Sequence, residues 1–276
     1  GINHNGDFNL ARKLIDAAYV TGWDAAKLQR RNPHKSIPEH QKNIMRKTPW
    51  GEMTYLDYKL KIEFDDEQHI ALNRYCNEKP LDYGLSFWDM TNLDLIFTLD
   101  LPWIKIPSAH LTNDDLIKAV CDYHKPIILS TGMSTVAEID HAVELLNTEC
   151  GNWTDCWDPY DPFILMHSNS TYPASQAELN LNCIPAMIER YNCLVGYSGH
   201  EVDLEPSVIA VALGACAIER HITLSHELWG TDQKASLEIH AADMLAKRIR
   251  GVKTMLGDGK KVVYESEIEV RRKLRG

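Results

Sequence analysis

The sequence predicts an α/β fold, a TIM (β/α)8 barrel in which the first strand is truncated. Seven short apolar runs are each followed by a segment with helical spacing of its apolar residues, the order expected of a parallel sheet. Because the chain opens with a loop and a helix, we expect a further strand before Gly1. Eight strand–helix units in roughly 250 residues are typical of this barrel. The seven runs lie near residues 24, 81, 103, 126, 162, 193 and 215.

The first elements are recognised by their apolar spacing and by the residues that follow them. After the loop GINHNGDF, a helix is predicted because Leu10, Leu14 and Ala18 have helical spacing. The short strand Asp24–Gln29 runs into a basic cluster. Residues 32–64 form a connection that is too long for a plain loop, so we expect a functional insertion there.

Helices and strands alternate through the middle of the chain. Pro126–Thr131 is a continuous apolar run, as in strands that are buried on both faces. The helix after it begins with Thr135-Val-Ala-Glu138, the pattern of a capping box. Residues 148–161 are expected to form a surface excursion. The remaining elements of this region are a helix over Asp65–Glu78, a strand over Leu81–Trp88, a helix near Thr91–Leu99, a strand over Trp103–Ser108 and a helix from about Thr112.

Three more apolar runs complete the set, and each of them ends in polar residues. They are Pro162–Ser168, Cys193–Tyr197 and Ala215–Ile218. A helix over Pro206–Leu213 separates the last two runs. The final predicted helix carries Leu245, Ile249, Val252 and Leu256 at helical intervals.

Composition and charge exclude several classes of protein. With 276 residues, of which 44% are hydrophobic, the chain can bury a large core, and no apolar run reaches the ~18 residues of a membrane helix. We therefore expect no membrane partner. The net charge of −10 argues against nucleic acid. Seven cysteines without a CxxC pair fit reduced thiols in a cytoplasmic protein.

A doubly wound open sheet, the alternative fold, is disfavoured because no glycine-rich phosphate-binding fingerprint follows any strand.

Cations and hydroxyl groups follow several of the predicted strands. Because the carboxyl ends of barrel strands meet at one face, we expect these side chains to converge. Two ammonium groups and several hydroxyl donors together would bind a phosphate and a carboxylate. Taken singly, a serine after a strand is more often a turn residue, and a lysine more often reaches solvent. The residues are Lys27, Lys105, Ser108, Ser130, Thr131, Ser170 and Ser198.

Two histidines follow neighbouring predicted strands. His200 is expected on the same strand face as Ser198, and His221 on the same face as Glu219, because side chains alternate with a period of two. Two imidazoles at neighbouring strand ends are a candidate metal-binding pair. The alternative is that both are hydrogen-bonded loop residues.

Nine separated motifs stand in the order and at the spacing of one known family. They are GINHNGD, KLQRR, TYLDYK, IKIPSAHLTN, STGMS, HSNSTYPA, VGYSGHE, ERHITL and GTDQKASLE. In these motifs the chain resembles the barrel domain of the sialic acid synthase (N-acetylneuraminate synthase) family over essentially its whole length. The resemblance implies an enzyme that condenses phosphoenolpyruvate with N-acetylmannosamine or a related N-acylated amino sugar. Its products would be phosphate and a nonulosonic acid.

The resemblance also implies roles for individual residues. It assigns a divalent metal, Mn2+ or Mg2+, to His200 and His221. We expect catalytic roles for Asp232 and for Glu219, which lies two residues before His221 and would hold a metal-bound water. Phosphoenolpyruvate is expected to bind Lys27, Lys105, Ser108, Ser130, Ser170 and Ser198. The sugar is expected to contact Gln29, Tyr172 and Asp232.

Two parts of the family pattern are expected outside this sequence. The family has an acidic residue in an A-E-I-G segment just before the GINHNG motif, and many members carry a small antifreeze-like domain after the barrel. We therefore predict a barrel domain over residues 1–258 and, over residues 259–276, a C-terminal linker segment toward that domain. The resemblance further implies a homodimer that depends in part on the same domain.

Two other functions remain open at this point. The first is a Schiff-base aldolase or lyase on the same barrel, with Lys105 as the amine. The second is a non-catalytic barrel that binds a sugar or phosphate. The presence of both histidines, both lysines and Asp232 speaks against a purely binding role.

Overall fold

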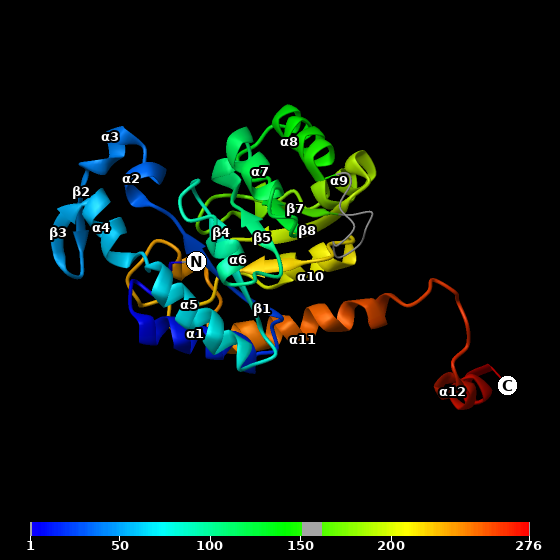
Figure 1. The fold of residues 1–276 in the computed structure, drawn as a ribbon. Coiled ribbons are helices and arrows are strands. Elements are labelled where there is room, and N and C mark those ends of the chain that lie inside the picture. Colours follow the sequence, from blue (N-terminus) through cyan, green and yellow to red (C-terminus); the bar gives the residue numbers. More distant parts are fainter. Residues whose placement is uncertain (1, 151–161, 276) are drawn as a thin grey trace.

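A curved parallel sheet forms the centre of the molecule (Figure 1). The computed structural model describes residues 2–150 and 162–275. Within these ranges the main sheet has seven strands in the order β1-β4-β5-β6-β7-β8-β9, and neighbouring strands pair in parallel. The strands are β1 (Ala25–Arg30), β4 (Asp82–Phe87), β5 (Ile104–Ile106), β6 (Ile127–Ser130), β7 (Phe163–Ser168), β8 (Leu194–Gly199) and β9 (Ile218–Arg220).

Helices connect the strands and surround the sheet (Figure 1). Side chains cap the first turns of several of them, because the first N–H groups of a helix have no partner within it. The Asp7 carboxylate accepts hydrogen bonds from the backbone of Asn9 and Leu10. The predicted capping box is confirmed, since the Glu138 carboxylate accepts from the Thr135 N–H at 2.7 Å and Thr135 Oγ1 accepts in return. The connecting helices are α1 (Phe8–Val20), α5 (Asp66–Asn77), α6 (Leu95–Thr98), α7 (Asp114–Cys121), α8 (Val136–Cys150), α9 (Cys183–Tyr191), α10 (Glu205–Ala212) and α11 (Ile239–Leu256).

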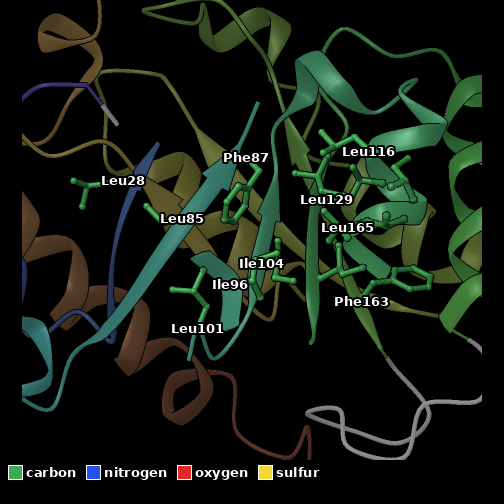
Figure 2. Close-up of a cluster of buried hydrophobic side chains, with 14 of the residues drawn as sticks. Leu28, Leu85, Phe87, Ile96, Leu101, Ile104, Leu116, Leu129, Phe163 and Leu165 are labelled. Carbon is green, nitrogen blue, oxygen red and sulfur yellow. The ribbon is translucent and has the colours of Figure 1, made fainter. Parts of the chain in front are cut away.

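The main hydrophobic core lies between the strands and the helices that cover them. Ile106, Leu129 and Leu165 are aligned in register across β5, β6 and β7, and all three are fully buried. Figure 2 shows Leu129 and Leu165 near Leu116 of α7, and all of these residues belong to one core cluster. Ile164 and Met166, which alternate with Leu165 along β7, are buried as well, and burial on both faces explains why such strands read as almost continuous apolar runs.

The sheet is open between β1 and β9, which form its two edges. A cavity of about 510 Å³ lies between them, and it is also lined by apolar residues of α1 and α11. In a closed eight-stranded barrel this is the place of a further strand. The observed fold therefore agrees with the prediction of a TIM barrel without its first strand.

The predicted insertion is an ordered unit beside the barrel (Figure 1). Tyr58 and Ile62 pack in a hydrophobic cluster with Ile2 and Trp229, which joins the insertion to the loop after β9. The elements of the insertion are α2 (Pro33–Ser36), α3 (Glu39–Lys42), the antiparallel pair β2 (Met45–Thr48) and β3 (Gly51–Thr54), and α4 (Tyr55–Ile62).

Three predicted boundaries are wrong. The run Ala215–Ile218 precedes most of β9, because the ladder with β8 begins only at its last residue. The strand predicted over Trp103–Ser108 shortens to β5, since Pro107 has no N–H to donate and a 3-10 turn follows it. The helix predicted near Thr91–Leu99 shrinks to α6, because Asn92 adopts a positive φ of 64° that does not fit a helix.

The last helix, α12 (Glu265–Arg275), lies apart from the body of the molecule and is exposed along its length (Figure 1). The assignment of residues 259–276 to a linker toward a further domain stays a prediction. The predicted surface excursion over residues 148–161 falls largely on residues 151–161, which lie outside the described residues. None of the helices in the described ranges combines the length and the apolar character that crossing a membrane requires.

We expect Leu129→Ala to lower the free energy of unfolding by about 2–5 kcal/mol, because it leaves a cavity in the core. Leu274→Ala makes the same chemical change on α12, where 79% of the residue is exposed, and should change stability by less than about 0.5 kcal/mol. Urea unfolding followed by circular dichroism measures both. Equal effects of the two substitutions would contradict the description of the core.

Candidate active site

One carboxylate joins two lysines at the carboxyl ends of the strands. Glu219 of β9 lies 3.6 Å from Lys27 Nζ of β1 and 3.2 Å from Lys105 Nζ of β5, measured to its two different oxygens. Ser198 of β8 donates a hydrogen bond to Glu219 Oε1 at 3.3 Å. Side chains from four strands therefore meet at one point, as the barrel prediction requires.

The charges at this point are strongly coupled. Burial alone would raise the pKa of the Glu219 carboxyl, but the ammonium groups of Lys105 and Lys27 outweigh it and hold the pKa well below its ordinary value. Burial lowers the pKa of Lys105 to about 8, against the opposing effect of Glu219. Lys105 is 2% exposed, and apart from this ion pair its Nζ has no hydrogen-bond partner among the described residues. Two ammonium groups thus approach the same carboxylate in the site.

Hydroxyl groups gather around Gly132 at the end of β6. The Gly132 N–H donates to Ser108 Oγ at 3.0 Å. A Cβ atom on Gly132 would lie 2.3 Å from Ser170 Oγ and 2.9 Å from Ser108 Oγ, so both hydroxyls approach the bare backbone closely. Ser130, two residues earlier, is buried. Two of the predicted serines thus converge on one glycine, and backbone and hydroxyl donors stand together there.

The two histidines lie beside each other. The ring centroids of His200 and His221 are 5.3 Å apart, with the ring planes at 71°. His200 Nδ1 lies 2.5 Å from the backbone oxygen of Asn169, and because a carbonyl can only accept, this nitrogen carries the proton. In the neutral ring Nε2 then has the lone pair, which accepts from the Tyr172 hydroxyl at 2.9 Å. Burial lowers the pKa of His200 and keeps the ring neutral.

Asp232 approaches the second histidine. Its Oδ2 lies 3.3 Å from His221 Nδ1, and the Thr231 hydroxyl donates to its Oδ1 at 2.7 Å. Burial lowers the pKa of His221 to about 3, although Asp232 acts in the opposite direction, so we describe this ring as neutral. The ring of Tyr172 lies 5.4 Å from that of His221. In the described ranges no group of three or more His, Cys, Asp or Glu side chains is arranged to hold a metal, so ligation by the two histidines stays a prediction.

A buried ion pair that the sequence analysis missed supports both histidine loops. Arg220 Nη1 lies 3.1 Å from Glu201 Oε1, and both side chains are 1% exposed. The Tyr197 hydroxyl donates to the other oxygen of Glu201 at 2.7 Å. Each member of the pair is the direct neighbour of one histidine, His200 or His221. The available signal was the presence of a charged residue beside each histidine in the motifs VGYSGHE and ERHITL.

Gln29 lies on another side of the site and is already engaged. Its side-chain oxygen accepts a hydrogen bond from Arg31, whose Nε lies 2.7 Å from Glu63 Oε1 in a largely buried ion pair. No described contact joins Gln29 directly to Tyr172 or Asp232, the other residues predicted to contact the sugar. Arg31 and Glu63 were also missed, because nothing in the sequence pattern reveals that they pair.

Comparison with known proteins decides the family. The profile described as NeuB family matches residues 14–261, which is most of the chain. The chain belongs to the NeuB family. This confirms the predicted resemblance to the sialic acid synthases and the prediction that the chain is an enzyme of this type.

Individual relatives of this NeuB-family chain cover nearly all of it. It is 36% identical over 269 residues to the N,N'-diacetyllegionaminic acid synthase of Campylobacter jejuni, a match that spans 97% of this chain and 78% of the relative. It is 30% identical to the N-acetylneuraminate-9-phosphate synthase of Homo sapiens, over 99% of this chain and 74% of that protein. The chain thus spans about three quarters of the length of these relatives.

Solved structures agree with the family. The N-acetylneuraminic acid synthetase of Leptospira borgpetersenii, solved in complex with citrate, superposes with a TM-score of 0.84 at 29% identity. The match covers 100% of this NeuB-family chain and 90% of that structure. The family and this structural neighbour together confirm the predicted α/β barrel.

We expect the loss of one member of the Glu201–Arg220 pair to destabilise the protein more than the pair itself stabilises it. Removing one partner leaves an unpaired buried charge, so Arg220→Met should cost about 3–5 kcal/mol of unfolding free energy. The double variant Glu201→Gln with Arg220→Met removes both charges and should be more stable than the sum of the single effects by more than about 1 kcal/mol. Urea unfolding of the four proteins gives this coupling. Additive effects would show that the two groups do not interact.

Proposed function

We propose that this NeuB-family protein condenses phosphoenolpyruvate with an N-acylated amino sugar and releases phosphate and a nonulosonic acid. The observation that carries the proposal is the convergence of Lys27 and Lys105 on Glu219 at the strand ends. The names of the relatives support the product class, since one is a legionaminic acid synthase and another an N-acetylneuraminate-9-phosphate synthase. These names differ in whether the product carries a phosphate, so the substituents of the sugar need a separate argument.

Phosphoenolpyruvate fits the charge of the site because it carries a phosphate and a carboxylate. The two ammonium groups balance these charges, and charge-assisted hydrogen bonds to an anion are stronger than those between neutral groups. The hydroxyls of Ser108 and Ser170 offer further donors at one place, and Ser108 Oγ accepts from the Gly132 N–H while keeping its own proton to donate. The absence of a side chain on Gly132 lets both hydroxyls approach the backbone there.

We also propose that His200 and His221 bind a divalent metal, Mn2+ or Mg2+. The donor set fits, because both rings are neutral and the proton of His200 is on Nδ1, so that Nε2 carries the lone pair. A metal at this nitrogen would take the place of the Tyr172 hydroxyl, which donates to it at 2.9 Å. Asn169 and Asp232 then act on the other nitrogens and orient the rings. A divalent ion bound there would supply Lewis acidity that polarises the sugar aldehyde.

The bond changes follow from the chemistry of an enol phosphate. The methylene carbon of phosphoenolpyruvate forms the new carbon–carbon bond with the aldehyde carbon of the open-chain sugar, whose oxygen takes up a proton. Water adds to the adjacent carbon of the former enol, and phosphate leaves by cleavage of the carbon–oxygen bond. Lys27 and Lys105 hold the leaving phosphate, and Asp232 and Tyr172 hold the sugar. Glu219 is ionised between the lysines, so its contacts support a role in positioning them.

One observation favours a second candidate function. The lowered pKa of Lys105, about 8, would help it act as a Schiff-base amine in a lyase. Its ion pair with Glu219 opposes this role, because the carboxylate stabilises the protonated amine. A trapping experiment separates the two functions.

We expect the full-length protein to release phosphate when it is given phosphoenolpyruvate, Mn2+ and N-acetylmannosamine or a related amino sugar. Chelation of the metal should reduce the rate by at least about tenfold, and added Mn2+ should restore it. Phosphate release and the mass of the keto acid product are measured together. Borohydride with pyruvate should leave Lys105 unmodified. A trapped pyruvate adduct on Lys105 would favour the lyase, and the absence of phosphate release with every sugar would favour a binding protein.

A further inference from the structure

Lys59 of α4 is a buried ammonium group without an acidic partner. The residue is 5% exposed. Among the described residues, no carboxylate lies within 4.0 Å of its Nζ and no hydrogen bond reaches it; its recorded contacts are the rings of Tyr55 at 5.3 Å and Tyr58 at 4.9 Å. A buried charge of this kind costs free energy unless something compensates it. The insertion therefore holds a cation whose N–H donors are not used by any described carboxylate or carbonyl group.

Lys59 follows directly on a residue that packs against the loop we assign to the sugar. The Tyr58 ring packs edge-on against Trp229 at 5.0 Å, and Trp229 precedes Asp232 in the same loop. Burial lowers the pKa of Lys59 to about 8 and Arg31 lowers it further, while Glu63 and Asp232 raise it.

A second cation, Arg46, lies over the same aromatic ring as Lys59. The guanidinium of Arg46 on β2 lies 5.0 Å from the centre of the Tyr55 ring, which also faces Lys59. Arg46 is exposed, and its charge contributes to lowering the pKa of Lys59. Glu63, a nearby acidic residue of the insertion, is already paired with Arg31. Two cations of the insertion, Lys59 and Arg46, therefore lie at the same aromatic ring.

We propose that Lys59 and Arg46 bind a phosphate ester on the amino-sugar substrate, at the end of the sugar remote from its aldehyde. This inference rests on the proposed function and specifies its substrate class. A neutral acyl oxygen or hydroxyl would occupy one donor and leave two positive charges uncompensated. A phosphate ester carries about two negative charges and three acceptor oxygens, which two cations can share. The ring faces of Tyr55 and Tyr58 hold the ammonium from behind.

The test compares N-acetylmannosamine with N-acetylmannosamine 6-phosphate as substrates of the full-length protein. The wild type should have the higher kcat/KM with the phosphorylated sugar. Lys59→Met should raise the KM for the phosphorylated sugar by about 10- to 100-fold, the range of a lost charge-assisted contact, and change the KM for the other sugar by less than about threefold. Lys59→Arg, which keeps the charge, should restore part of the affinity.

Two further variants serve as checks. Lys61→Met makes the same charge change on an exposed residue of the same helix and should leave both KM values unchanged. Arg46→Met alters an exposed residue, so it tests the phosphate site even if Lys59→Met does not fold, and it should raise only the KM for the phosphorylated sugar.

Equal efficiency of the wild type with the two sugars, or a Lys59→Met effect that is the same for both, would overturn the inference. Binding of the sugar phosphate without phosphoenolpyruvate, measured by calorimetry, separates this outcome from failure of the proposed reaction. If no sugar supports phosphate release, loss of this binding in Lys59→Met still supports the phosphate site. Unchanged binding in that variant refutes it.

Discussion

The site depends on the Glu219 carboxylate, which holds the ammonium groups of Lys105 and Lys27 in place at the strand ends. Removing an ammonium group from water costs several kcal/mol in a protein interior, so Lys105 is tolerated at the strand ends only because Glu219 offsets its charge. The same carboxylate also approaches Lys27, which lies on a distant strand of the sheet. Two ammonium groups held close together are suited to an anion, which is the role that we propose for them. The barrel supplies the geometry, because parallel strands bring all their carboxyl ends to one face.

The surrounding structure prepares the other groups in the same way, by fixing charge and proton position before a ligand arrives. The buried pair of Glu201 and Arg220 stands beside both histidines, and the Asn169 carbonyl determines which nitrogen of His200 carries its proton. The insertion adds two further cations, Lys59 and Arg46, beside the Tyr55 ring. One pair of cations from the barrel and one from the insertion fit the two anionic groups that we propose on the two substrates.

The sequence predicted the parts that follow from topology. Strand order and the polar residues at strand ends were sufficient to bring Lys27, Lys105 and Ser198 to one face, and the capping box before α8 was visible as a local pattern. Partners that depend on register were not predictable, because β9 begins at Ile218 and only its pairing with β8 brings Glu219 to Ser198. The burial of Lys59 depends on packing between α4 and a loop far along the chain, which no local pattern reveals. Ligand roles and the metal stay predictions.

The most direct measurement is the affinity for phosphoenolpyruvate as a function of pH, in the wild type, in Lys105→Met and in a control, Lys125→Met. Lys125 is a partly exposed lysine that precedes β6 and pairs with Asp100. With the pKa of Lys105 near 8, its ammonium is present below that pH and lost above it, so wild-type affinity should be constant below about pH 8 and fall above it by up to about tenfold per pH unit. Lys105→Met should bind at least about tenfold more weakly at pH 7 and lack this dependence, while Lys125→Met should match the wild type. Undiminished binding by Lys105→Met would contradict the central claim that this buried lysine holds the anion.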